Sequence, residues 1–219
     1  MKVRVKICCI SSPEEARLAI SYGASAIGLV SAMPSGPGPI PEELIAEIAA
    51  TIPPGVSSFL LTSRLDAASI IEQQRKTRVN TLQLVDAVPL ETYRDLRREL
   101  PGIGLVQVVH VTGIQAIEEA CRVAPYADAL LLDSGNPSLT VKELGGTGRT
   151  HDWMISRRIR EEVGAPIFLA GGLRAENVAD AIRQVKPYAV DVCSGARTNG
   201  RLDEEKLSRF LRSVEEVHA

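Results

Sequence analysis

The sequence has no long apolar run and no excess of charge of either sign. Its 219 residues include 25 Lys and Arg against 27 Asp and Glu, which gives a formal net charge of -2. A membrane-spanning helix needs roughly 18 or more consecutive apolar residues, and nucleic acids and anionic membranes are usually bound by clustered basic residues. The sequence therefore predicts neither a membrane nor a nucleic-acid partner.

Cysteine is also scarce, with four in the chain, and Cys8 and Cys9 are adjacent. The four do not follow a metal-ligand spacing, so we expect no metal site. Residues 1–8 lack the apolar core of a signal peptide, and we expect a cytoplasmic protein with free thiols. A disulfide between adjacent cysteines would close a strained ring, so we expect Cys8 and Cys9 to be free thiols as well.

What the sequence does contain is a regular alternation of short β-branched runs and amphipathic stretches. We predict strands at 3–8, 25–30, 56–61, 81–84, 104–109, 128–132, 166–170 and 188–193. We predict helices at 13–22, 41–51, 66–77, 89–99, 114–124, 152–163, 175–185 and 203–217. Such alternation is typical of parallel strands joined by crossover helices.

Eight strand–helix units favour an α/β fold in which residues 1–219 form a single-domain (β/α)8 barrel. A doubly wound open sheet is the alternative, but that fold usually has fewer strands. The Gly- and Pro-rich segment 31–43 lies between a strand and a helix, so it does not indicate a domain boundary. In a barrel, the loops that follow the strands build the active site, and polar residues at those points are the candidates for function.

The first strand predicts Cys8 as such a candidate. A period of two places Arg4, Lys6 and Cys8 on one face, toward the barrel interior. The alternate residues then face the helices: Val3, Val5 and Ile7. Cys8 lies at the rim that bears the active site, where it is either a small core residue or a group that takes part in the reaction. Cys9 points the opposite way or already belongs to the loop.

Asp133 is the second candidate, because it follows the apolar run of the sixth strand. An Asp at this point is often a turn or cap residue. Alternatively, partial burial at the mouth of the barrel raises the pKa of the carboxyl group and suits it to general acid catalysis.

Glycine-rich segments follow the sixth, seventh and eighth strands. Glycines allow backbone N–H groups to approach an anion closely, and the loops after the last two strands of a barrel commonly bind phosphate. The residues concerned are Gly145, Gly146, Gly148, Gly171, Gly172, Ser194 and Gly195. They predict a phosphorylated small-molecule substrate.

Together these motifs resemble the phosphoribosylanthranilate isomerase family of single-domain barrels. They are KICCI (6–10), LLLD (130–133), GGTGRTHDW (145–153), AGGL (170–173) and VDVCSG (190–195). The family has GGTGKTFDW in place of GGTGRTHDW and VDVSSG in place of VDVCSG. The resemblance implies an Amadori rearrangement in tryptophan biosynthesis, which converts N-(5-phosphoribosyl)anthranilate into the 1-deoxyribulose-5-phosphate derivative. It implies no metal and no organic cofactor.

The resemblance also implies roles for individual residues. Asp133 would be the general acid that protonates the ring oxygen, and Cys8 the general base that removes the C2 proton. Lys6, on the same strand face, is expected to lower the pKa of the Cys8 thiol. Asp191 would orient the phosphate loops. The full set of expected substrate- and phosphate-binding residues is Lys6, Gln83, Gly145, Gly146, Gly148, Gly171, Gly172, Asp191, Ser194 and Gly195.

The departures from the family pattern lie at the same rim. Cys9 replaces a glycine, and segment 31–43 lacks the arginine that recognises the anthranilate carboxylate. Val85 and Asp86 stand where the family has His and Gly. The remaining candidates for a positive charge in this region are Arg64, His110, Arg149 and Arg197.

Two other functions therefore stay open. One is a paralogous phosphosugar isomerase or lyase with a different substrate, and the other is a non-catalytic barrel that binds a phosphometabolite. The chain is expected to be a monomer or a homodimer.

Overall fold

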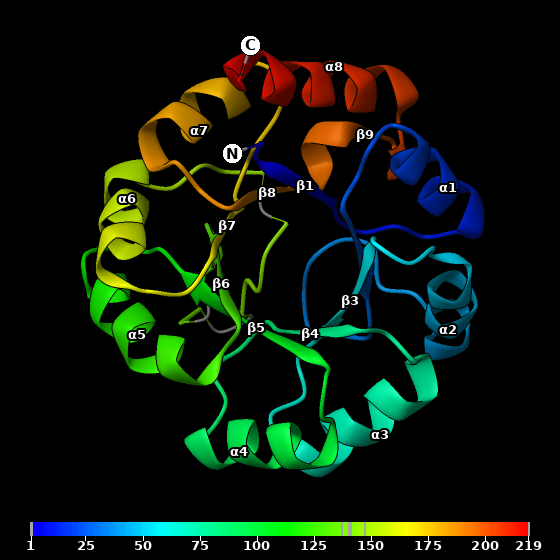
Figure 1. Ribbon diagram of the computed structural model, residues 1–219, viewed down its shortest axis with the longest axis vertical. Helices are drawn as coiled ribbons and strands as arrows, with labels where there is room; N and C mark the ends of the chain where they lie inside the picture. Colours follow the sequence, from blue (N-terminus) through cyan, green and yellow to red (C-terminus); the bar gives the residue numbers. More distant parts are fainter. Residues whose placement is uncertain (1, 137, 140–141, 147, 219) are drawn as a thin grey trace.

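In the computed structural model, which describes residues 2–136, 138–139, 142–146 and 148–218, eight parallel strands close into a barrel (Figure 1). The strands pair in chain order, and β8 pairs with β1. They are β1 (Arg4–Ile7), β2 (Ala26–Val30), β3 (Ser57–Thr62), β4 (Thr81–Leu84), β5 (Gly104–His110), β6 (Ala129–Asp133), β7 (Ile167–Leu169) and β8 (Ala189–Val192). The predicted (β/α)8 barrel is confirmed, and the open doubly wound sheet is not formed.

A ring of helices surrounds the barrel (Figure 1). They are α1 (Pro13–Ser21), α2 (Glu42–Thr51), α3 (Ala67–Thr77), α4 (Leu90–Glu99), α5 (Gln115–Val123), α6 (Trp153–Glu162), α7 (Val178–Val185) and α8 (Glu204–Glu215). The start of α1 follows from its sequence, because the Ser12 hydroxyl accepts a hydrogen bond from the Glu15 amide at 3.2 Å and Pro13 opens the first turn. No helix among the described residues has the length and apolar character needed to cross a membrane.

Helix α7 begins later than the predicted residue 175. The Arg174 amide donates to the Asn177 side chain, which in turn donates to the Gly172 carbonyl, at 2.9 and 3.0 Å. These bonds hold residues 174–177 in turns, so regular helix starts at Val178. The sequence analysis also missed a short antiparallel pair, β9 (Arg197–Thr198) with β10 (Arg201–Leu202), and the 3-10 turn η2 (Ser194–Ala196).

The strands bury two separate apolar layers. Val5 and Ile7 of β1 belong to the larger layer, between the strands and the helices. Cys8 belongs to the smaller layer inside the barrel, and Lys6 is fully buried. The predicted alternation along the first strand is thereby confirmed.

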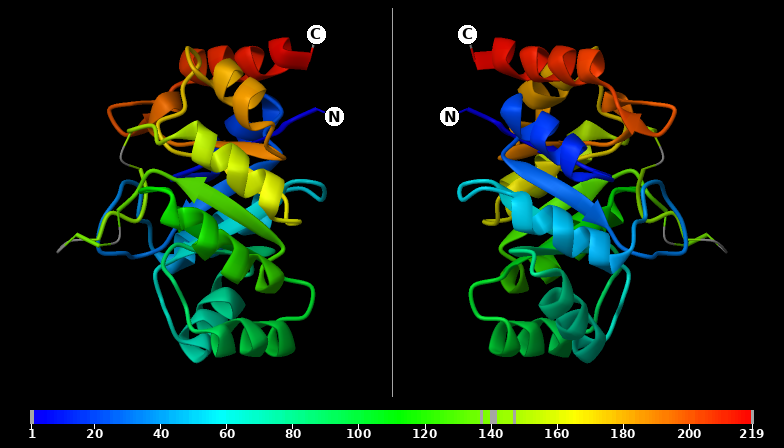
Figure 2. Two further views of the ribbon diagram at one scale, coloured as in Figure 1. Left: turned by 90° about the vertical axis from the view of Figure 1, so that its left-hand side faces the viewer. Right: turned by 90° about the vertical axis from the view of Figure 1, so that its right-hand side faces the viewer.

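Two loops extend from the same end of the barrel. Figure 2 shows the segments after β2 and β6 projecting together, and the Ser35 hydroxyl donates a hydrogen bond to the Lys142 carbonyl between them. The first loop contains four prolines and is tied back to its strand, since the Ile40 amide donates to the Val30 carbonyl at 2.9 Å. The two loops thus meet above the mouth of the barrel.

Candidate active site

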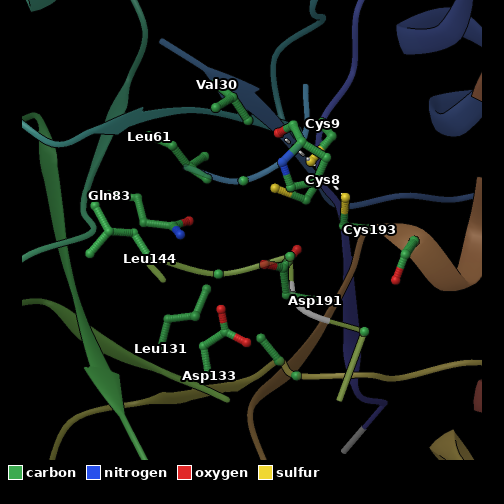
Figure 3. Close-up of a pocket in the computed structure, with 18 of the residues that line it drawn as sticks. Cys8, Cys9, Val30, Leu61, Gln83, Leu131, Asp133, Leu144, Asp191 and Cys193 are labelled. Atoms are coloured by element: carbon green, nitrogen blue, oxygen red, sulfur yellow. Dashed lines mark hydrogen bonds between the residues drawn. The ribbon is translucent and has the colours of Figure 1, made fainter. Parts of the chain in front are cut away.

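A cavity opens where the carboxyl ends of the strands meet, and it contains most of the predicted site residues (Figure 3). Those that line it are Cys8, Gln83, Asp133, Gly145, Gly146, Gly148, Gly171, Gly172, Asp191 and Ser194. Two predicted residues do not line it. Lys6 lies beneath the floor, fully buried, and Gly195 lines an adjoining hollow.

A buried ion pair supports the floor of the cavity. Lys6 Nζ lies 2.8 Å from Asp191 Oδ2, and the two side chains are 0% and 7% exposed. Burial acts to lower the pKa of Lys6, but the negative charges of Asp191 and Cys8 outweigh it and hold the pKa above its usual value. Lys6 is therefore a fixed positive charge under the cavity.

Cys8 follows the end of β1 and is buried at the rim. A hydrogen bond from the Cys9 side chain lowers the pKa of the Cys8 thiol, and the charge of Lys6 lowers it further against the opposing effect of burial. A lowered pKa increases the fraction of thiolate, which is the basic form. Cys9 itself adopts a φ of 62°, in the left-handed region that favours glycine, as expected where the sequence pattern has Gly.

Asp133 ends β6, which β7 and β8 separate from β1 in the strand order. It is 7% exposed, and burial raises the pKa of its carboxyl group although the Ser134 amide donates to Oδ1 at 2.8 Å. The backbone of Gly145 passes so close that an added Cβ would lie 2.6 Å from Asp133 Oδ2. The carboxyl group thus sits in a confined site that favours its protonated form.

Two further polar atoms of the cavity residues have no partner. Gln83 Oε1 and Asp191 Oδ1 are both buried without a hydrogen bond to any described residue. Buried polar atoms are normally paired, so each is a candidate contact for a ligand. The apolar residues of the lining are Val30, Met33, Leu61, Leu131 and Leu144.

The adjoining hollow shares Gly148, Gly172 and Ser194 with the main cavity. Its outer wall carries three cations that the sequence analysis did not single out, namely Arg174, Lys206 and Arg209. Lys206 and Arg209 belong to α8, whose position against the loops after β7 and β8 is a tertiary feature, so no local sequence signal marks them. At Gly172 an added Cβ would lie 2.6 Å from the Arg149 carbonyl carbon, which shows how closely the two loops pack.

None of the four candidate cations lines the main cavity as the structure describes it. Arg64 donates to the Ser69 carbonyl and pairs with Glu42. Arg149 pairs with Glu143, and Arg197 pairs with Glu15. His110 Nε2 lies 2.9 Å from the Val85 carbonyl. The four candidate cations are thus each bonded outside the lining of the main cavity.

Gly28 is a structural determinant that the sequence analysis missed. A Cβ at this position in β2 would lie 2.9 Å from Cys8 Sγ and 3.1 Å from Lys6 Nζ. The sequence could have indicated this role, because a glycine on the interior face of the second strand lies next to Lys6 of the first strand in a barrel. Among the described residues, no group of His, Cys, Asp and Glu side chains is arranged to hold a metal ion.

A family model described as N-(5'-phosphoribosyl)anthranilate (PRA) isomerase matches residues 5–213. The chain belongs to this isomerase family. A relative named N-(5'-phosphoribosyl)anthranilate isomerase from Methanosarcina acetivorans is 35% identical, over 100% of this chain and 96% of its own length. The isomerase of the same name from Acidithiobacillus ferrooxidans is 36% identical, over 97% of each chain.

Solved structures of family members agree with the fold. The phosphoribosyl anthranilate isomerase of Thermotoga maritima superposes with a TM-score of 0.84 at 30% identity, covering 98% of this chain and 99% of that one. A second isomerase, solved with reduced 1-(o-carboxyphenylamino)-1-deoxyribulose 5-phosphate, superposes with a TM-score of 0.82 at 28% identity and the same coverage. The resemblance inferred from the sequence motifs is therefore confirmed at the level of the family.

Proposed function

We propose that this chain is a phosphoribosylanthranilate isomerase, which catalyses the Amadori rearrangement of N-(5'-phosphoribosyl)anthranilate in tryptophan biosynthesis. The observation that carries the proposal is that Cys8 and Asp133 share one cavity. Both side chains line it from strands that are not neighbours in the barrel, and their pKa values move in opposite directions. Two titratable groups whose environments separate their pKa values in this way are suited to act as base and acid.

In the proposed reaction Asp133 acts first. Its protonated carboxyl group gives a proton to the ring oxygen of the sugar, and the C1–O bond breaks as the lone pair of the anilino nitrogen forms the Schiff base. The Cys8 thiolate then removes the proton from C2, and the C2–H electron pair forms a C1=C2 double bond while the C1=N electrons return to nitrogen. The resulting enolamine becomes the 2-keto product when C1 gains a proton and the C2 hydroxyl group loses one, so the protein supplies no electrons and needs no metal or organic cofactor.

The substrate phosphate is assigned to the backbone N–H groups of Gly172 and Gly195, beside Ser194. The hollow lined by these residues contains the cations Arg174, Lys206 and Arg209 against one carboxylate, Glu176, which pairs with Arg209. The excess of positive charge favours an anion there. The aromatic ring is assigned to the apolar wall formed by Val30, Leu61 and Leu131. Gln83 Oε1, which has no partner among the described residues, is assigned a hydrogen bond to the substrate.

The test is turnover of freshly made phosphoribosylanthranilate by the purified chain and by variants. Cys8→Ala and Asp133→Ala are each expected to reduce kcat by about a hundredfold to ten-thousandfold, which is the usual contribution of general acid–base catalysis. Cys121→Ala is the control, because this exposed thiol lies on α5 away from the cavity. A folded wild-type chain without activity would reject the proposal.

One observation favours a second function. The cavity, as far as the structure describes it, presents no cation to an aromatic carboxylate. A paralogous isomerase that acts on a phosphosugar with an uncharged aglycone would fit this wall, and it would retain the roles of Cys8 and Asp133. Comparison of kcat/KM for phosphoribosylanthranilate and for the phosphoribosylated aniline that lacks the carboxylate separates the two, because only the first function predicts a preference for the carboxylate.

We further propose that residues 1–219 form a single domain that acts in the cytoplasm as a monomer or a homodimer. A similar solved structure of the Thermotoga maritima isomerase is described as a monomer generated from a dimeric enzyme. Sedimentation velocity at several protein concentrations measures the state of this chain.

A further inference from the structure

Two of the thiols at the mouth of the barrel are in direct contact. Cys9 Sγ and Cys193 Sγ lie 2.6 Å apart, and the two residues follow β1 and β8, which are neighbours in the barrel (Figure 3). Both line the cavity; Cys9 is buried and Cys193 is half-buried. The contact therefore joins two loops of the proposed active site.

The backbone holds Cys9 in the orientation that makes this contact. Its φ of 62° is unusual for a residue with a side chain, and its carbonyl accepts a hydrogen bond from Arg197 Nη2 at 2.5 Å. The proposed general base is Cys8, so the proposed reaction requires neither a thiol nor a left-handed φ at residue 9. Cys9 and Cys193 are also two of the positions at which the chain departs from the motifs of its family, which have Gly and Ser there, and the departures fall on residues that touch.

We propose that Cys9 and Cys193 form a reversible disulfide. The two sulfur atoms need to approach by only about half an ångström to reach an S–S length of about 2.05 Å. The third nearby thiol, Cys8, is adjacent to Cys9 in the chain, where a bond would close a strained ring. The favoured partner of Cys9 is therefore Cys193.

The oxidant is a small-molecule disulfide, RSSR. The more accessible Cys193 thiolate attacks one sulfur of RSSR, which forms a mixed disulfide and releases one RS⁻, protonated to RSH. Cys9 then gives up its proton and attacks the Cys193 sulfur, which releases the second RS⁻, protonated to RSH. Two cysteine thiols are oxidised, one disulfide is reduced to two thiols, and an excess of dithiol reverses both steps.

The bond has a consequence for the neighbouring thiol, and this part of the inference rests on the proposed function. The Cys9 side chain hydrogen-bonds to Cys8 and thereby lowers the pKa of Cys8. A disulfide leaves Cys9 without an S–H proton to donate, so the thiolate form of Cys8 loses this support. The oxidised chain is therefore expected to turn over more slowly than the reduced chain at neutral pH.

The test exposes the reduced full-length chain to oxidised glutathione. We expect the intact mass to fall by two hydrogen atoms, free thiols to fall from four to two, and peptide mapping to link residue 9 with residue 193. Dithiothreitol restores all three values. Cys193→Ser is expected to prevent the loss of two hydrogens, whereas the matched control Cys121→Ser, on an exposed thiol, leaves it intact.

Three outcomes would overturn the proposal: no change in mass, a stable glutathione adduct without an internal bond, or a link between Cys8 and Cys9. Isomerase activity is measured on the same samples before and after oxidation. Turnover that is unchanged when mapping shows a complete bond rejects the effect on Cys8. A reduced chain with no isomerase activity rejects the proposed function, and the mass and mapping data still decide whether the disulfide forms.

Discussion

At the residue scale, the closeness of Cys8, Lys6 and Gly28 sets the position of the proposed base. Gly28 contributes no side chain, and this absence leaves room for Cys8 Sγ on one side and Lys6 Nζ on the other. Both neighbours are buried, so neither can move away freely from an added methyl group.

Gly28→Ala is therefore expected to lower kcat/KM by about tenfold or more, because overpacking a filled site costs roughly 1–3 kcal/mol and displaces the groups around it. Gly164→Ala is the matched control, since a Cβ there meets nothing within 4 Å. Steady-state kinetics and circular dichroism of both variants check the prediction. Equal kinetics for the two variants would contradict it.

His151 gives a prediction on the pH dependence of stability. It stands where the family motif has Phe, and burial lowers its pKa from 6.5 to about 4. Because the folded state holds the imidazole neutral, its contribution to stability is complete above about pH 6.5 and is lost as the pH falls toward 4. Acid thus favours the unfolded state, in which the ring can take up a proton.

His151→Phe removes this proton uptake. We expect the decrease in Tm between about pH 7.5 and pH 5 to be smaller in the variant than in the wild type, whatever the difference between their Tm values at the higher pH. Differential scanning calorimetry over this range measures it. An identical decrease in both proteins would show that other groups dominate.

Individual residues differ in how far the sequence could predict them. Cys8 and Asp133 stood out because reactive side chains at strand ends are few. The contact between Cys9 and Cys193 joins positions 184 residues apart, and no local pattern encodes it. The cations Lys206 and Arg209 were missed for the same reason, since α8 brings them to the site.

At the element scale, a second buried ion pair, in addition to that of Lys6 and Asp191, links the two ends of the chain. Arg197 of β9 donates to Glu15 of α1 and to the carbonyl groups of Cys8 and Cys9. The Arg197 and Glu15 side chains are 7% and 14% exposed. This arginine therefore connects the loop after β1 with the ribbon that follows β8.

Arg197→Met is expected to destabilise the chain by about 3 kcal/mol or more, since removing one partner of a buried pair leaves a charge without compensation. Arg17→Met is the control, because Arg17 and Glu14 form an exposed pair of the kind that contributes little. Urea unfolding followed by circular dichroism gives both values. A loss below about 1 kcal/mol for Arg197→Met would contradict the assigned role.

The elements themselves were largely predictable. The strand at residues 81–84 has the expected bounds. Each of the eight predicted strands and eight predicted helices is present, because each combines a local propensity with a consistent burial pattern. The elements that the sequence did not predict correctly are either very short or have an end fixed by side-chain hydrogen bonds. The β9–β10 pair has two residues in each strand, and the start of α7 depends on hydrogen bonds of Asn177.

At the scale of the whole molecule, the proposed phosphate site exists only when the barrel is closed. Gly148, Gly172 and Gly195 reach it from the loops after β6, β7 and β8, and the hollow they line is completed by α8. An anion that binds there binds the folded state and not the unfolded chain, so it stabilises the fold by mass action.

Inorganic phosphate is therefore expected to raise Tm in a saturable manner, with a stabilisation of about 2.7 kcal/mol at a hundred times its Kd. Sodium chloride at matched ionic strength is the control for screening. Phosphate is also expected to inhibit competitively with respect to the phosphorylated substrate. An equal rise in Tm with chloride would show a general salt effect in place of a site.

The proline-rich loop after β2 has a consequence for proteolysis. A protease binds its substrate as an extended strand, and exposed loops between strand and helix are the usual points of cleavage. Pro34, Pro37, Pro39 and Pro41 lack backbone N–H groups and fix φ at every second or third position, and the Ile40 amide is already bonded to Val30. Although this loop projects from the barrel, we therefore expect it to be a poor protease substrate.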